Sequence, residues 1–300
     1  MEHKHDENIV NKYEDALKKY ATDLNDNEVV RQVKELTDKH KAENNTPETI
    51  KSLIGFIDLT SLGTSDTQES ILAMVEKVNK IDSERPDMPV PAALCVYPNM
   101  AGLVKDSLEA DNVRIACVAG GFPSAQTFPE IKTAETSLCI MDGADEIDTV
   151  MPVGKYLSGD YEGMADEIDE IKAACGTHKL KVILETCELK TASDIKKASI
   201  LCMYSGADFI KTSTGKGSRG ATPEAAYIMC KAIKEYYLET DRKVGFKAAG
   251  GIKTADDALT YYTIVKEVLG KEWLTPELFR IGATGLLDNL MADIEKHGEA

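Results

Sequence analysis

The sequence predicts an α/β protein built as a (β/α)8 TIM barrel, with extra helices at its N-terminal end. Three observations predict this fold. From residue 54 onward, eight short apolar runs recur along the chain, and amphipathic stretches of helical period separate them. Lysines and carboxylates stand near the C-terminal ends of several runs, where such a barrel places its active site. No GxGxxG motif follows the first run, so a doubly wound open sheet is the weaker alternative.

The expected strands are short and mostly apolar, as buried parallel strands are. The chain has 300 residues, enough for one large α/β domain or two small ones. The barrel nearly exhausts it, so we expect a barrel over residues 51–300, an N-terminal helical extension over residues 1–50, and no second domain. The expected strands are Ile54–Leu59, Ala92–Val96, Val113–Val118, Glu146–Met151, Lys181–Thr186, Phe209–Ser213, Val244–Ala249 and Leu278–Ala283.

Capping signals mark where three of the intervening helices begin. Ser65 and Gln68 have the spacing of a capping box. Thr222 precedes Pro223 at the start of a second helix, and Thr254 precedes acidic residues in the first turn of a third. These signals place helices after the first, sixth and seventh expected strands.

The first 50 residues are highly charged and helical in pattern. Thr46 and Pro47 have the pattern of an N-cap followed by a first-turn proline. We expect these helices to pack on the outside or the end of the barrel, and a mobile arm or partner-binding segment is the alternative. The apolar residues that recur at three- and four-residue steps are Ile9, Tyr13, Leu17 and Tyr20, and then Val29, Val33 and Leu36.

Charge and cysteine content narrow the classes of function. The chain has 51 Asp and Glu against 35 Lys and Arg, a formal net charge of −16. We therefore expect neither nucleic acid nor a membrane as a partner. The seven cysteines are odd in number and form no CxxC pair, which indicates reduced thiols and a cytoplasmic location. The N-terminus also lacks the apolar segment of a secretion signal.

Four charged residues stand at or near the ends of expected strands. Asp58 lies in the first strand and Asp148 in the fourth, whereas Lys211 and Lys247 lie in the sixth and seventh. In a barrel these side chains converge on one mouth. Inward-pointing charges are costly unless paired, so four together indicate chemistry, although a structural ion-pair network would have the same pattern. Lys211 by itself has a simpler interpretation, a strand-end lysine that reaches solvent.

The two lysines favour imine chemistry. A free lysine has a pKa of about 10.4 and is a poor nucleophile near neutral pH. Burial and the neighbouring ammonium of Lys247 would lower the pKa of Lys211, so that its free amine could attack a carbonyl. Asp148, or a water it holds, would move protons, and Asp58 would orient Lys247. This chemistry needs no cofactor and no metal, and no histidine falls at a strand end near other candidate ligands.

Glycine-containing turns follow the last three expected strands. Loops after strands seven and eight of such a barrel commonly hold a phosphate. Their backbone N–H groups favour an anion, especially beside a helix N-terminus. One Gly-Gly pair by itself is a simple turn, but two such turns at consecutive strands predict a phosphate site. The candidate substrate-binding residues here are Gly215, Gly250, Gly251, Gly282, Thr284 and Gly285.

Several motifs resemble those of the deoxyribose-phosphate aldolase family, over roughly residues 53–297. The resemblance implies a class I aldolase that interconverts 2-deoxyribose 5-phosphate with acetaldehyde and glyceraldehyde 3-phosphate. The most specific motifs are Gly143-Ala144-Asp145-Glu146-Ile147-Asp148, Phe209-Ile210-Lys211-Thr212-Ser213-Thr214-Gly215-Lys216 and Gly245-Phe246-Lys247.

The resemblance also implies a role for each matching position. It makes Lys211 the Schiff-base lysine, Lys247 the neighbour that lowers its pKa, and Asp148 the proton-transfer carboxylate. Asp58 matches the supporting acid. Thr214 and Lys216 lie where the substrate hydroxyl is held.

The chain departs from the family pattern in two places. Relatives often have Lys-Pro-Ala-Gly-Gly after strand seven, whereas this chain has Lys247-Ala248-Ala249-Gly250-Gly251, and the loss of proline loosens that turn. Some relatives carry two phosphate-binding serines after strand eight, where this chain has Thr284 and Gly285. One lost donor to a charged group costs roughly 1.5–3 kcal/mol unless another donor replaces it.

Other interpretations stay open. The chain could be another lysine-imine aldolase for a different sugar phosphate, or a non-catalytic phosphate-binding barrel. The second is weaker, because an unused buried charge cluster destabilises a fold. Cys95, at the end of the second strand, is either a reactive thiol that contacts substrate or a small apolar filler. We expect sugar phosphate and aldehyde as partners, and a homodimer is one assembly that the sequence does not decide.

Overall fold

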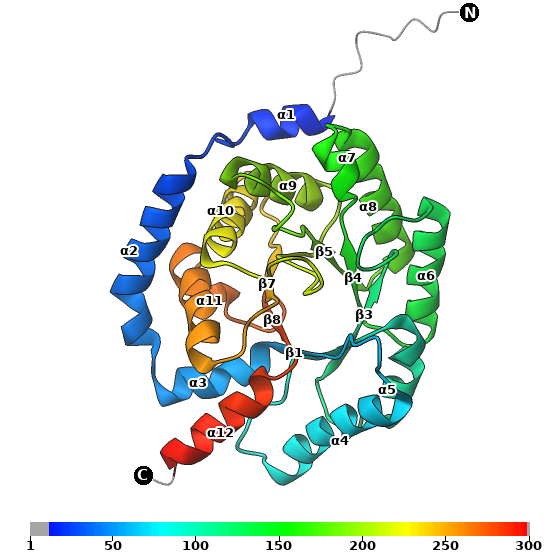
Figure 1. Cartoon of the computed structure of the whole chain (residues 1–300), viewed down its shortest axis with the longest axis vertical. Helices are drawn as coiled ribbons and strands as arrows, with labels where there is room; N and C mark the ends of the chain where they lie inside the picture. The colour runs from blue at the N-terminus through cyan, green and yellow to red at the C-terminus, as the bar shows by residue number, and fades with distance from the viewer. Residues whose placement is uncertain (1–11, 299–300) are drawn as a thin grey trace, which may run out of the picture.

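Eight parallel strands close into a barrel in the computed structural model, which describes residues 12–298 (Figure 1). Neighbouring strands follow the order of the chain, and β8 pairs with β1 to complete the ring. The strands are β1 (Ile57–Thr60), β2 (Ala93–Val96), β3 (Arg114–Ala119), β4 (Glu146–Val150), β5 (Lys179–Ile183), β6 (Phe209–Lys211), β7 (Gly245–Ala249) and β8 (Phe279–Ala283).

Helices surround the strands as an outer layer (Figure 1). From residue 12 onward, three helices precede β1: α1 (Lys12–Lys18), α2 (Asp26–Asn44) and α3 (Pro47–Leu53). Within residues 12–298, no helix has the length and apolar character needed to cross a membrane. The later helices are α4 (Gln68–Glu84), α5 (Ala101–Ser107), α6 (Pro129–Met141), α7 (Val153–Leu157), α8 (Tyr161–Cys175), α9 (Ala192–Tyr204), α10 (Pro223–Thr240), α11 (Ala255–Val268) and α12 (Leu286–Gly298), with 3-10 turns η1 (Ile54–Phe56), η2 (Pro98–Met100) and η3 (Lys271–Trp273).

All eight expected strands are confirmed in order, although several ends shift. The run expected to start at Ile54 begins as the 3-10 turn η1, so β1 starts at Ile57. β5 begins two residues earlier than expected and ends at Ile183, because Glu185 has a φ of 49°, outside the range of a strand. β6 ends at Lys211 rather than Ser213.

The capping prediction is correct for three helices and wrong for one. Thr46, Thr222 and Thr254 are N-caps of α3, α10 and α11, and each side chain accepts a backbone N–H three residues on. The box expected at Ser65 and Gln68 does not form. The cap of α4 is instead Thr67, which exchanges hydrogen bonds with Ser70, so the helix starts at Gln68.

The N-terminal helices pack on the outer ring of the barrel. α1 lies against α9, α2 against α10 and α11, and α3 against α11 and α12 (Figure 1). Val29 and Val33 of α2 are buried with Ala192 and Ile228, so the apolar face of α2 is covered by the barrel helices. Ile9, expected on the first helix, lies outside the described residues. The division at residue 50 stays a prediction.

The strand register brings charged residues together inside the barrel. Lys211 pairs with Lys247 between β6 and β7, and Lys247 pairs with Arg280 between β7 and β8. Across the barrel, Asp148 pairs with Lys181 between β4 and β5. Side chains of directly paired residues point to the same face of a sheet, and all five are buried. This level of the barrel interior is therefore charged rather than apolar.

Candidate active site

Asp148 on β4 is the centre of a buried ion network. Its Oδ2 accepts hydrogen bonds from the Nζ atoms of Lys211 and Lys247, each at 2.7 Å, and its Oδ1 accepts one from Lys181 at 2.9 Å. Burial acts to raise the pKa of Asp148, but the lysines beside it, Lys181 first, outweigh burial and hold the pKa well below its usual value. Asp148 is therefore an ionised carboxylate shared by three lysines.

Asp58 on β1 supplies a second carboxylate. Its Oδ2 accepts a hydrogen bond from Lys247 Nζ, and its Oδ1 accepts one from Arg280 Nη1 at 2.7 Å. Burial acts to raise the pKa of Asp58, but Lys247 and Arg280 lower it by more. Lys247 is thus held between two carboxylates, whereas Lys211 contacts one.

Three residues that were not predicted as site residues complete the network: Lys181, Glu146 and Arg280. Glu146 Oε2 lies 2.6 Å from Lys181 Nζ, and its Oε1 lies 2.8 Å from Arg280 Nη2. The signal was strand alternation, since Glu146 is two residues before Asp148 and thus on the same face of β4. That rule places a side chain in the interior but does not identify its partner across the barrel.

The two neighbouring lysines have opposite pKa shifts. Burial is the largest effect on Lys211 and lowers its pKa; Lys247 adds to this effect, whereas Asp148 opposes it. Burial also acts to lower the pKa of Lys247, but Asp148 and Asp58 together raise it above its usual value. Lys247 therefore stays an ammonium, while Lys211 is shifted toward the free amine.

The charges of the network balance when one lysine is neutral. Four cationic groups meet three carboxylates, so full ionisation would leave one uncompensated positive charge in the barrel interior. An unpaired buried charge is costly. Loss of a proton from Lys211 removes it, in agreement with the direction of the Lys211 pKa. The seven groups are Lys181, Lys211, Lys247, Arg280, Asp58, Glu146 and Asp148.

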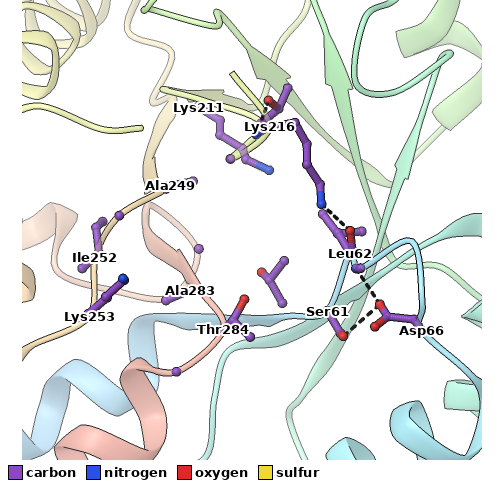
Figure 2. A pocket seen from close by; sticks show the side chains of 18 residues that line it. Ser61, Leu62, Asp66, Lys211, Lys216, Ala249, Ile252, Lys253, Ala283 and Thr284 are labelled. Atoms are coloured by element: carbon purple, nitrogen blue, oxygen red, sulfur yellow. Dashed lines mark hydrogen bonds between the residues drawn. The ribbon is translucent and has the colours of Figure 1, made fainter. Parts of the chain in front are cut away.

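A cavity of about 440 Å³ opens at the C-terminal ends of the strands (Figure 2). Its walls are the loops after β1, β6, β7 and β8. Of the seven network residues, all within the described chain, only Lys211 lines this cavity. Figure 2 shows its side chain extending into the open space, with Lys216, Ala249 and Thr284 around it. The lowered-pKa amine is thus the part of the network that a ligand can reach.

The structure separates the expected site residues into two levels. Asp58, Asp148 and Lys247 lie in the buried network beneath the cavity. Ser61 and Lys253 are among the further residues that line the cavity and were not predicted from the sequence. Lys253 could have been found from its place just after the Gly250-Gly251 turn. The expected residues that do line the cavity are Lys211, Thr214, Gly215, Lys216, Gly250, Gly251, Gly282, Thr284 and Gly285.

Cys95 differs from the other predicted substrate-binding residues in its position. It does not line the cavity, and its side chain packs with Leu62, Ala93, Ala116 and Val118. The residue is fully buried, and burial raises the pKa of its thiol. This geometry favours the small apolar filler over the reactive thiol.

The loops after β7 and β8 offer backbone donors to the cavity. Gly250 and Gly251 have φ values of 89° and 82°, a conformation that favours glycine. Gly285 is outside that region, and a side chain added there would meet no atom within 4 Å. It directly precedes α12, so the N-terminal end of that helix lies at the cavity, where an anion is favoured. Lys253 adds a positive charge on the same side (Figure 2).

The residues at this mouth suit an organic anion better than a resident cation. Within residues 12–298, no group of three or more His, Cys, Asp or Glu side chains is arranged to hold a metal ion. The carboxylates beneath the cavity are already paired with lysines and an arginine.

The fold and site define a (β/α)8-barrel enzyme with a buried lysine at the floor of its cavity. Residues 53–271 match the model of the DeoC/LacD family aldolases. The human deoxyribose-phosphate aldolase is 42% identical over 254 residues, which cover 81% of this chain and 80% of that protein, and the mouse enzyme is 40% identical over 255 residues with the same coverage. The chain belongs to the DeoC/LacD aldolase family, and it is an aldolase, a carbon–carbon lyase.

A solved structure shows the same fold. The deoxyribose phosphate aldolase of Aeropyrum pernix aligns with a TM-score of 0.63 and 23% sequence identity, and the alignment covers 87% of this chain and 96% of that chain. At this identity the likeness concerns the fold alone, and it confirms the barrel.

Proposed function

We propose that this aldolase cleaves 2-deoxyribose 5-phosphate reversibly into acetaldehyde and glyceraldehyde 3-phosphate, through a Schiff base on Lys211. The observation that carries the proposal is the position of Lys211, the one network residue that lines the cavity in the described chain, with a lowered pKa. The human and mouse relatives bear the name of this activity.

The imine route divides the cleavage into steps that these residues can serve. The Lys211 amine adds to the C1 aldehyde, and loss of water gives a protonated imine. The C3 hydroxyl then loses its proton, the C2–C3 bond breaks, and its electron pair moves into the imine as an enamine. Glyceraldehyde 3-phosphate leaves. A proton added at C2 and hydrolysis of the imine release acetaldehyde and restore Lys211.

Asp148 and Lys247 would manage the charge during these steps. Asp148 Oδ2 lies 2.7 Å from both Nζ atoms, so it can accept and return protons at Lys211, directly or through one water. Lys247, kept charged by its two carboxylates, disfavours a second ammonium beside it. Asp58 holds Lys247 in place and away from the cavity.

The substrate phosphate would bind at the opposite wall of the cavity. Backbone N–H groups of the Gly250-Gly251 turn, the start of α12 and Lys253 form a positive wall there. Thr284 offers a hydroxyl on the same wall. A sugar phosphate can then reach from this wall to Lys211.

Reductive trapping tests the imine. Borohydride reduction with acetaldehyde, followed by intact mass and peptide mapping, should place an ethyl group on Lys211. Turnover of 2-deoxyribose 5-phosphate then separates this activity from the alternative, a lysine-imine aldolase for another sugar phosphate. An adduct on a different lysine would overturn the Lys211 assignment, and trapping without turnover would favour the alternative.

Assembly and location stay predictions. A homodimer and a cytoplasmic location are the expectations, and the Aeropyrum pernix relative is described as tetrameric. Sedimentation of the full chain measures the assembly directly.

A further inference from the structure

Glu185, between β5 and α9, is a buried carboxylate to which the proposed reaction gives no task. It is 7% exposed, and its φ of 49° is uncommon for a residue with a side chain. Within the part of the chain that the structure describes, its carboxylate is held by Thr214 and Cys187 rather than by a cation. A buried carboxylate needs hydrogen-bond donors, so the groups that donate to Glu185 indicate what it holds in place.

Both carboxylate oxygens of Glu185 contact cavity-lining or loop residues, and two of these bonds go to Thr214. Oε1 accepts a hydrogen bond from the Thr214 backbone N at 3.3 Å, and Oε2 accepts one from the Thr214 hydroxyl. A hydroxyl has one proton and two lone pairs. Since the proton of Thr214 is directed to Glu185, its Oγ1 can offer only lone pairs to other groups.

One of these lone pairs is already used. Thr214 Oγ1 accepts a hydrogen bond from the Lys216 backbone N at 3.0 Å, which leaves one lone pair. Thr214 lines the cavity. The remaining lone pair can therefore accept a hydrogen bond from a ligand hydroxyl, but Thr214 has no proton to donate to a ligand carbonyl or ether.

The loop around Thr214 is closed over Glu185. A side chain at Gly217 would lie 2.7 Å from Cys187 Sγ and 3.3 Å from the carboxyl carbon of Glu185. Lys216 Nζ also donates to the Leu62 carbonyl at 2.5 Å and ties this loop to the one after β1 (Figure 2). The carboxylate is thus confined, so its bond to Thr214 has a fixed geometry.

We propose that Glu185 is a positioning residue that fixes Thr214 Oγ1 as a hydrogen-bond acceptor, so that the cavity selects substrates with a non-reacting hydroxyl. This inference rests on the proposed function. The C3 hydroxyl of 2-deoxyribose 5-phosphate must lose its proton near Lys211 and Asp148. The C4 hydroxyl does not react, so it is the donor for Thr214, and it becomes the C2 hydroxyl of glyceraldehyde 3-phosphate.

The test uses the condensation direction and two acceptor aldehydes. Acetaldehyde is condensed with glyceraldehyde 3-phosphate or with 3-oxopropyl phosphate, which has the same phosphate but lacks the C2 hydroxyl. We expect the wild type to prefer glyceraldehyde 3-phosphate by at least about tenfold in kcat/KM. Without the C2 hydroxyl of this aldehyde, the remaining lone pair of Thr214 Oγ1 has no hydrogen-bond donor. In Glu185→Gln the amide cannot accept both Thr214 bonds, and the preference should fall to near one.

Matched variants separate positioning from a general structural defect. Thr214→Ser keeps the hydroxyl and should keep the preference, whereas Thr214→Val should lose it. The double variant Glu185→Gln/Thr214→Val should lose no more than Thr214→Val alone, because Glu185 acts through Thr214. If Glu185→Gln does not fold, equal preferences in Thr214→Ser and Thr214→Val would overturn the inference by themselves.

The outcomes also separate this inference from the proposed function. Imine trapping with acetaldehyde needs no substrate hydroxyl, so it should persist in folded Glu185→Gln. A wild type that traps acetaldehyde and turns over both acceptors, while Glu185→Gln keeps the wild-type preference, overturns the role of Glu185 alone. A wild type that neither traps acetaldehyde on Lys211 nor turns over either acceptor overturns the proposed function and this inference together.

Discussion

Lys211 and Lys247 are paired neighbours on β6 and β7, and the structure gives them opposite properties. Lys211 lines the cavity and has a lowered pKa, whereas Lys247 is fully enclosed and has a raised one. Burial by itself acts to lower the pKa of both lysines. The difference is the number of carboxylates, because Lys247 contacts Asp58 and Asp148 while Lys211 contacts Asp148 only. Ion-pair geometry, not residue type or depth alone, thus decides which lysine is the amine.

The largest expected effect comes from removing Lys211, the lysine of the buried ion network that lines the cavity. Lys211→Ala should abolish imine trapping and reduce turnover by at least about 10⁴-fold, because no other amine in the network reaches the cavity. Trapping followed by mass spectrometry and a turnover assay measure both effects. Lys216→Ala is the matched control, since Lys216 also lines the cavity, and it should still form the adduct. An adduct in Lys211→Ala at the wild-type rate would show that a different lysine reacts.

Removing the carboxylate of Asp58 should reduce the pKa difference between Lys247 and Lys211 and destabilise the fold. Asp58→Asn leaves Arg280 and Lys247 short of one buried partner, at a cost of about 3–5 kcal/mol in unfolding free energy. Chemical denaturation measures the loss. Asp66→Asn, in the neighbouring β1 loop, is a control outside the network. A stability equal to wild type would mean that Asp58 does not balance these charges.

The same carboxylate gives the pH dependence of stability its sign. The pKa of Asp58 is lowered in the folded protein, so its stabilising contribution is present above its unfolded pKa, near 3.9, and is lost as pH falls further. The stability of Asp58→Asn should therefore fall less steeply than that of wild type below about pH 4.

Removing the charge of Lys247 should have a smaller, pH-dependent effect. In Lys247→Leu the like charge beside Lys211 is lost and Asp148 serves one lysine fewer, so the pKa of Lys211 rises. Imine formation requires the free amine of Lys211, so its pH profile should shift to higher pH. The rate near neutral pH should fall by about ten- to a hundredfold. The pH profile of trapping measures this shift. Wild-type rates at neutral pH would show that Lys247 does not tune Lys211.

The smallest effect is expected at the rim, away from both lysines. Gly285 has room for a side chain and no left-handed φ, so Gly285→Ser can add a hydroxyl toward the phosphate. It should lower KM for 2-deoxyribose 5-phosphate by a few fold, up to about tenfold, with kcat nearly unchanged. Unphosphorylated deoxyribose is the control substrate and should show no change. An unchanged KM for both sugars would mean that backbone donors already satisfy the phosphate oxygens.

Local sequence signals predicted most of the fold. Apolar runs and caps such as Thr222 and Thr254 are short-range features, and their positions were confirmed. The signals failed where two caps compete, as at Ser65 and Thr67, and where one residue breaks a strand, as at Glu185. The residue that caps a helix depends on which backbone N–H groups lack a partner in the folded chain.

The sequence by itself determined the barrel, the positions of Lys211 and Asp148 at strand ends, and the glycine turns that line the cavity. The reason is that side-chain alternation and strand order fix which residues share a face of the sheet. Only the tertiary structure decided that Arg280 and Lys181 join the network, that Lys247 is closed off, and that Cys95 lies outside the cavity. The reason is that ion pairing and burial depend on atoms brought together from distant strands, and energies of buried charges change sharply over a few ångströms.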